Sequence, residues 1–161
     1  MTSLRSVIVA LLALGAVMAA GAGPAAADGP RTAPPQQSKD PAYTEAVNAI
    51  KAGQFKAAVP LLEGVVARDD RNADAFTWLG YAVRKDGDPA RAIPIYQKAL
   101  ALDPKHRGAH EYIGEAYLMV GDLAGAKQHL ARLDSLCFFS CEEYRDLKKA
   151  IEAFEKKSGA K

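Results

Sequence analysis

Apolar residues recur along the chain at the spacing of an amphipathic helix, and residues 73–104 show this pattern clearly. Two apolar stripes of helical period lie here on either side of the polar stretch KDGDPARA, residues 85–92. The stripes consist of Phe76, Leu79, Gly80 and Val83, and then of Ala92, Ile95, Tyr96, Ala99 and Leu100. Within the polar stretch, Gly87 suits the end of one helix, while Asp88 and Pro89 suit the start of the next. The pattern therefore predicts two helices joined by a tight turn.

The same turn recurs at a fixed distance along the chain. Three series of small residues share a spacing of 34 residues, namely Gly53, Gly87 and Gly121, then Ala58, Ala92 and Ala126, and then Ala46, Gly80 and Gly114. A helical hairpin cannot bury its apolar face alone, so repetition at this period is typical of stacked hairpins. The sequence predicts three such hairpins, with small residues where neighbouring helices approach closely.

The middle hairpin resembles a tetratricopeptide repeat, whose pattern is an aromatic residue, then Leu-Gly, Ala, a second aromatic residue and Pro. The residues that carry the resemblance are Phe76, Leu79, Gly80, Ala92, Tyr96, Ala99 and Pro104. The other two hairpins depart from the pattern at the Pro position, where the third has Phe138 and the first has Asp70. The resemblance implies an all-α fold, a right-handed α-solenoid of three repeats. We expect these repeats at residues 39–72, 73–106 and 107–140.

A different pattern follows the third repeat, in residues 141–158. One apolar stripe of helical period runs through this segment and consists of Tyr144, Leu147, Ile151 and Phe154. Charged residues surround the stripe. Because a solenoid needs a terminal element with a polar outer face, we expect a C-terminal capping helix. Ser140 and Glu143 match the S-x-x-E capping box that marks the start of a helix.

The first 27 residues have the pattern of a secretory signal peptide. Arg5 precedes an apolar run, and the small residues at 25–27 suit a signal peptidase. A retained membrane anchor is the alternative, but the run is shorter than the roughly 20 apolar residues that span a bilayer. Residues 28–38 are rich in Pro and polar side chains, so we expect a flexible linker. The chain is expected to be exported to the periplasm, or alternatively to the medium, without stable membrane insertion after cleavage.

The charge balance and the absence of catalytic motifs argue against nucleic-acid binding and enzymatic activity. The chain carries 21 Lys and Arg against 19 Asp and Glu, which gives no electrostatic reason to expect nucleic acid as a partner. Motifs of serine hydrolases, zinc proteases and phosphate-binding loops are absent from the sequence. We therefore expect no catalytic residues, no cofactor and no enzymatic activity.

In tetratricopeptide proteins the first helices of successive repeats line a concave groove that binds a peptide or a partner helix. The resemblance places ten residues of this chain in such a groove: Tyr43, Val47, Ile50, Thr77, Tyr81, Arg84, Lys85, Glu111, Glu115 and Leu118. Two alternatives stay open, because the residues of the first repeat could pack against the linker and Arg84 and Lys85 could simply be solvated. Val47 and Asp74 replace the Asn and Lys of family members that clamp a terminal carboxylate, so that ligand is not expected.

The two cysteines, Cys137 and Cys141, lie between the third repeat and the capping helix. In an oxidising compartment a disulfide is the default, and their spacing at a helix corner permits one. Two alternatives remain, a redox-active thiol pair and a copper(I) site on two thiolates. Without a C-x-x-C motif, a disulfide that joins the capping helix to the repeats is the preferred interpretation.

The three histidines give a weaker metal hypothesis. His106 and His110 are four residues apart, but His106 follows Pro104 in a turn and His110 occupies the aromatic position of the repeat. Packing and solvent exposure are therefore their expected roles, and no metal site is expected. His129 is expected to be exposed.

These patterns together predict an exported, non-enzymatic protein-interaction module or assembly scaffold of the bacterial envelope. Its expected partner is a protein or peptide bound in the groove. One alternative is an exported thiol-redox or copper-handling protein that uses Cys137 and Cys141. A further alternative is a structural role in which the repeats associate with one another.

Overall fold

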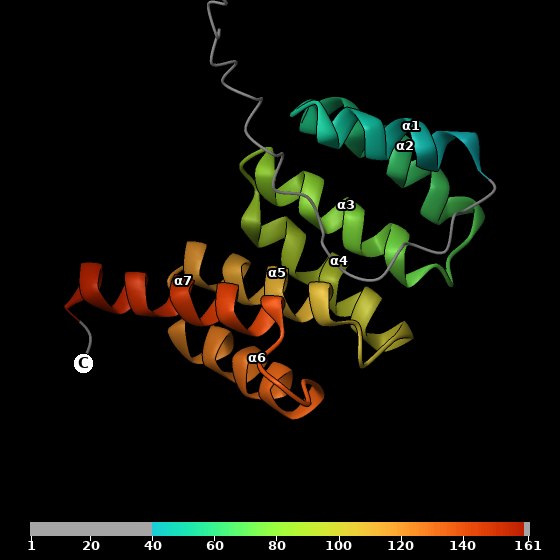
Figure 1. The fold of residues 1–161 in the computed structure, drawn as a ribbon. Helices are drawn as coiled ribbons and strands as arrows, with labels where there is room; N and C mark the ends of the chain where they lie inside the picture. The colour runs from blue at the N-terminus through green and yellow to red at the C-terminus, as the bar shows by residue number, and fades with distance from the viewer. Residues whose placement is uncertain (1–39, 160–161) are drawn as a thin grey trace, which may run out of the picture.

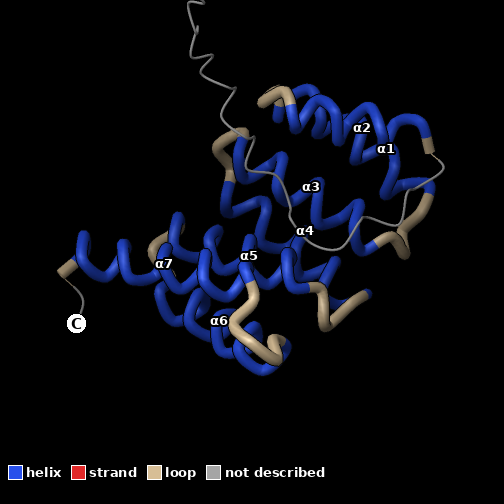
Figure 2. The backbone as a smooth tube through the Cα atoms, in the orientation of Figure 1, coloured by secondary structure: helices blue, strands red, loops and turns tan. Residues whose placement is uncertain are grey.

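The computed structural model describes residues 40–159, and every regular element in this part of the chain is an α-helix (Figure 2). The helices are α1 (Pro41–Lys51), α2 (Phe55–Arg68), α3 (Ala73–Lys85), α4 (Pro89–Leu102), α5 (Arg107–Met119), α6 (Leu123–Leu136) and α7 (Glu142–Ser158). The predicted signal peptide, 1–27, and the predicted linker, 28–38, lie outside the described residues. Among the helices described, none combines the length and apolar character needed to cross a bilayer.

The first six helices form three hairpins that stack in chain order, α1 with α2, α3 with α4 and α5 with α6 (Figure 1). Each hairpin packs on the next, through α2 against α3 and α4 against α5. The last helix, α7, packs on both α5 and α6 and so covers the end of the stack. This arrangement confirms the predicted all-α solenoid that ends in a further helix.

Each hairpin turns at a glycine in the left-handed backbone region. The φ angles are +74° at Gly53, +104° at Gly87 and +85° at Gly121. Side chains with a β-carbon are disfavoured in this region, which explains why glycine recurs at the turn. After two of the turns an aspartate caps the next helix: Asp88 accepts a hydrogen bond from the Arg91 N–H at 3.0 Å, and Asp122 accepts one from the Gly125 N–H at 2.8 Å.

Two further glycines allow helices to approach closely. A β-carbon on Gly80 would lie 2.7 Å from a ring carbon of Tyr96, and one on Gly114 would lie 2.6 Å from a methyl carbon of Leu147. Both distances are far below the roughly 3.5 Å at which carbon atoms make favourable contact. Glycine at these positions therefore makes room for a large side chain of the neighbouring helix.

Two hydrophobic clusters hold the stack together. The larger joins the first two hairpins to α5 and includes the fully buried Ile50, Leu62 and Tyr96. The smaller joins α5, α6 and α7 around Leu133 and Leu147, both 0 % exposed. The larger cluster joins neighbouring hairpins and the smaller joins the third hairpin to α7, so apolar burial depends on stacking.

The start of α7 differs from the prediction. Its N-cap residue is Cys141, which makes no side-chain capping bond, so the predicted capping box of Ser140 and Glu143 is wrong. Glu143 is buried at 4 % exposure with its Oε1 3.6 Å from Nε of Arg107 on α5. The carboxylate is thus directed toward the third hairpin and away from the helix start.

Candidate functional site

A cleft of about 620 Å³ lies between α3, α5 and α7. It is lined by Tyr81, Arg84, Lys85, Glu111, Tyr112, Glu115, Asp146, Lys149, Ala150 and Ala153. Because α3 and α5 are the first helices of the second and third hairpins, the cleft lies on the side of the stack that the repeat resemblance assigns to a binding groove. The α7 helix adds a third wall.

Arg84 lines the cleft and is 7 % exposed. Its Nη2 is 2.7 Å from Oε2 of Glu115, and its guanidinium lies 5.4 Å from the ring centre of Tyr81 and 5.5 Å from that of Tyr112. A buried cation is stabilised by such an ion pair and by the negative faces of aromatic rings. Arg84 therefore joins α3 to α5 and is part of the cleft framework.

Glu111, on α5, lines the same cleft and is also 7 % exposed. Burial raises the pKa of Glu111 to about 9, and the negative charges of nearby carboxylates add to this shift. Those carboxylates belong to Glu115, Asp146 and Glu143. Arg84 lowers the pKa, but less strongly than the other causes raise it. The Glu111 side chain is therefore a neutral acid at pH 7.

The α7 wall owes its shape to a second face of this helix. Leu147 and Ile151 face the hydrophobic cluster with α5 and α6, whereas Asp146, Lys149 and Ala153 line the cleft, and Ala150 contacts both. The two alanines are small, so they leave space between α7 and α5. This second face was not predicted as part of a site, although its spacing of three and four residues is visible in the sequence.

The structure brings together five of the ten predicted groove residues, and these are Tyr81, Arg84, Lys85, Glu111 and Glu115. The other five do not line the cleft. Tyr43 and Ile50 are buried in the larger hydrophobic cluster, and Val47 packs against it. Leu118 belongs to the smaller cluster, and Thr77 is 1 % exposed. Tyr112 lines the cleft but was not predicted, because it lies next to the selected position on α5.

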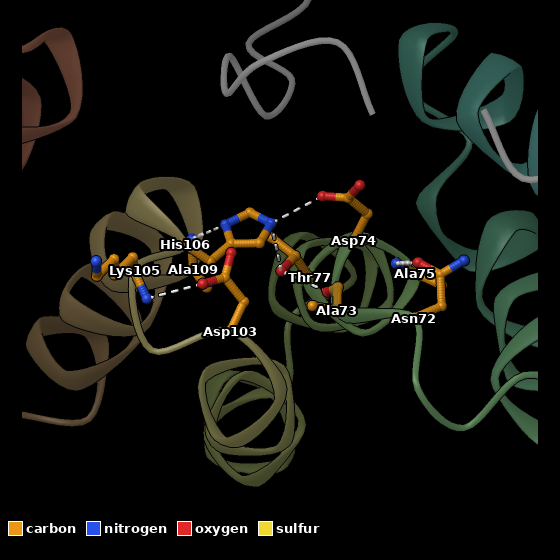
Figure 3. Close-up of polar contacts among 9 residues, drawn as sticks. All are labelled: Asn72, Ala73, Asp74, Ala75, Thr77, Asp103, Lys105, His106 and Ala109. Carbon is orange, nitrogen blue, oxygen red and sulfur yellow. Dashed lines mark hydrogen bonds and ion pairs between the residues drawn. The ribbon is translucent and has the colours of Figure 1, made fainter. Parts of the chain in front are cut away.

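Thr77 belongs instead to a polar contact between the second and third hairpins (Figure 3). His106, the N-cap residue of α5, accepts a hydrogen bond on Nδ1 from the Ala109 N–H at 3.1 Å. Its Nε2 therefore carries the proton and lies 2.9 Å from Oδ1 of Asp74 and 3.3 Å from Oγ1 of Thr77. Asp74 thus contacts the next hairpin. It occupies the repeat position at which family members that clamp a terminal carboxylate have Lys.

His110 and His129 form a second polar contact, between α5 and α6. His110 Nε2 is 3.1 Å from the Pro104 carbonyl, which can only accept, so the His110 proton is on Nε2. His129 Nδ1 then donates to His110 Nδ1 at 2.9 Å. The His129 ring also stacks on Tyr117, with centroids 5.7 Å apart. Because these neighbours half-bury His129, the expectation that it is exposed is wrong.

Burial lowers the pKa of His110 and lowers that of His129 to about 4. Both rings are therefore neutral at pH 7. The pair borders a second hollow of about 600 Å³ between α4, α5 and α6. No group of three or more His, Cys, Asp and Glu side chains is arranged to hold a metal ion within residues 40–159.

Cys137 and Cys141 are joined by a disulfide, with Cα atoms 5.6 Å apart. The bond closes the loop between α6 and α7. Phe138 and Phe139, inside this loop, are 94 % and 84 % exposed. With both thiols in the bond, neither cysteine is available as a nucleophile or a thiolate ligand in this state.

Comparison with protein families supports the interpretation of the repeats. Two family models, both described as tetratricopeptide repeat, match residues 43–106 and 83–151. Together these matches span well over half of the chain. Comparison with curated protein sequences gives no significant match.

Solved structures show the same fold. The Yersinia enterocolitica type III secretion translocator chaperone SycD has a TM-score of 0.67 at 22 % identity, over 73 % of this chain and 83 % of SycD. PcrH, in complex with the chaperone binding region of PopD, has a TM-score of 0.63 at 21 % identity, over 73 % of this chain and 90 % of PcrH. MamA from Desulfovibrio magneticus RS-1 is 32 % identical with a TM-score of 0.58, but the match covers 59 % of this chain and 54 % of MamA. The chain belongs to the tetratricopeptide repeat family.

Proposed function

We propose that the chain is a non-enzymatic interaction module that binds a peptide segment or helix of a partner protein in the cleft between α3, α5 and α7. The observation that carries this proposal is the cleft itself, which combines the rings of Tyr81 and Tyr112 with several charged side chains. Binding sites for peptides commonly combine aromatic surface with a few polar groups that fix orientation. The volume of about 620 Å³ suits a few side chains of a partner segment.

Structural neighbours support this proposal. SycD has been solved in complex with a peptide of the translocator YopD, and PcrH with the chaperone binding region of PopD. Both share the fold of this chain and bind a segment of another protein. Self-association is a second candidate, which is supported by a SycD structure described as an alternative dimer.

We further propose that the chain acts in the bacterial envelope, after removal of residues 1–27. The support is the sequence pattern of these residues and the presence of just two cysteines, which are paired in the structure. In an exported protein such a pair is stably oxidised. The module would then present its cleft to partners in an oxidising compartment.

The substitution Ala153→Trp tests the proposed site. Ala153 is exposed on the α7 wall, so an indole ring there should occupy the cleft with little effect on the core. We expect the variant to capture at least about tenfold less partner from an envelope extract than the wild type does. A tenfold weaker affinity corresponds to about 1.4 kcal/mol of binding free energy. Quantitative mass spectrometry of the captured proteins measures this loss.

Ala101→Trp is the matched control. Ala101 is exposed on α4 and does not line the cleft, so this variant should capture the partner as the wild type does. Circular dichroism should show the same helix content for all three proteins. Equal capture by Ala153→Trp and the wild type would show that the partner does not bind in this cleft.

A further inference from the structure

The cleft contains a carboxyl group whose burial is not compensated within the described residues. Glu111 is 7 % exposed and lines the cleft, and no hydrogen bond or ion pair links its carboxyl group to another described residue. Buried carboxyl groups in folded proteins are generally paired or hydrogen-bonded, because leaving water without compensation is costly. An unpartnered carboxyl group directed into an open cleft indicates a group that pairs with a ligand.

Of the three cations that line the cleft, Arg84 and Lys85 have other contacts. Arg84 pairs with Glu115 at 2.7 Å. Lys85 Nζ lies over the rings of Phe55 and Tyr81, at 5.8 and 5.6 Å from their centres. Lys149, on the α7 wall, is exposed. Glu111 therefore has carboxylate neighbours on α5 and α7, and in the described part of the chain none of the cations that line the cleft forms an ion pair with it.

We infer that the cleft selects partner segments that carry an arginine or a lysine, whose cationic group pairs with the Glu111 carboxylate. This inference rests on the proposed function, because it names the chemistry of the segment that the cleft binds. The aliphatic stem of Arg or Lys would pack against Ala150, Ala153 and the Tyr112 ring, which are all in the cleft wall. A metal cation fits less well, since no group of three ligating side chains is present among residues 40–159.

Binding of a cation should release a proton. Free Glu111 is neutral at pH 7, and it pairs with a cation only after its proton passes to the buffer. The titratable and charged groups around it are Tyr81, Arg84 and Lys85 on α3, Tyr112 and Glu115 on α5, and Glu143, Asp146 and Lys149 on α7. The affinity for an arginine peptide should therefore rise about tenfold per pH unit from pH 7 toward about 9, the pKa of free Glu111. Arginine itself does not titrate in this range.

A peptide selection tests the inference. A library of short peptides, acetylated and amidated to remove terminal charges, is selected on the full chain and on two variants. We expect the wild type to enrich peptides with Arg or Lys, and Glu111→Gln to lose this enrichment. Glu152→Gln is the matched control, because Glu152 is exposed on α7 and does not line the cleft. It should select the same peptides as the wild type.

Calorimetry on the best arginine peptide then measures affinity and proton release. We expect at least about tenfold weaker binding when the peptide arginine is replaced by methionine, and a flat pH profile for Glu111→Gln. Glu111→Gln should also raise the melting temperature of the free chain by several degrees at pH 7, because it removes a buried acid that ionises on unfolding. A residue that served stability alone would leave peptide selection unchanged.

Two results would overturn the inference, and they have different meanings for the proposed function. If Ala153→Trp abolishes binding but the selected peptides show no preference for Arg or Lys, the cleft binds peptides and the cation site is wrong. If the selected peptides bind Ala153→Trp as well as the wild type, both the cleft assignment and the cation site are wrong.

Discussion

At the scale of single residues, glycine has two distinct roles in this chain. Gly87 adopts a φ angle of +104° at a turn, whereas Gly80 lies inside α3, where a β-carbon would clash with the ring of Tyr96. The spacing of 34 residues predicted that both positions need a small side chain, but spacing alone does not distinguish a turn from a helix contact. The structure shows that backbone conformation selects glycine at the first position and packing selects it at the second.

Gly80→Ala should destabilise the chain by about 1–3 kcal/mol. The added β-carbon would lie 2.7 Å from the Tyr96 ring, and Tyr96 is 0 % exposed, so the ring has no room to move. Gly64→Ala is the control, because its β-carbon would meet only the flexible side chain of Arg68 at 3.2 Å. This change should be neutral or stabilising by up to about 1 kcal/mol, because alanine favours the helix. Urea unfolding measures both, and equal stability of Gly80→Ala and the wild type would contradict the packing argument.

At the scale of helices, the contact between α5 and α6 shows how tertiary structure changes a residue's role. His129 was predicted to be exposed, yet it stacks on Tyr117 and donates to His110. Both partners come from α5, so their positions depend on how the hairpin closes. Burial then keeps both imidazoles neutral, and protonation of either one opposes folding.

The stability of the chain should depend on this pair at acidic pH. The pKa of His129 is lowered from 6.5 to about 4 in the folded state, so the unfolded state binds more protons between these values. The free energy of unfolding is therefore unaffected by His129 protonation above pH 6.5. As the pH falls from 6.5 toward 4, it decreases by at most about 1.4 kcal/mol per pH unit. His129→Phe should remove this decrease. The difference in free energy of unfolding between the variant and the wild type, measured by urea unfolding, should therefore change between pH 7 and pH 4. A constant difference over this range would contradict a buried neutral His129.

At the scale of the whole molecule, the repeat architecture was predicted from the sequence, while half of the candidate site was not. Five of the ten predicted groove residues line the cleft, all from the second and third hairpins. Tyr43, Ile50 and Thr77 were assigned by their position in the repeat, but the structure buries them in contacts between helices. The α7 wall was missed because its position depends on how the last helix packs against α5, which no repeat pattern describes.

The mass of the protein isolated from the envelope tests two parts of the proposal, the removal of the signal peptide and the disulfide between Cys137 and Cys141. We expect a chain that begins near residue 28 and is two hydrogen atoms lighter than the reduced form, because the proposed export places Cys137 and Cys141 in an oxidising compartment. Treatment with a reductant should add these two hydrogen atoms. A protein that retains residues 1–27, or that carries two free thiols, would contradict the corresponding part of the proposal.

The sequence by itself determined the helical hairpins, their number and their stacking, because apolar period, turn glycines and the 34-residue repeat are local features that one hairpin shares with the next. Only the tertiary structure decided the composition of the cleft, the unpartnered state of Glu111 and the contact between His110 and His129. Those features depend on which side chains meet across helices that are distant in sequence. Burial and electrostatic interaction act through space, so the chemistry of this site follows from packing.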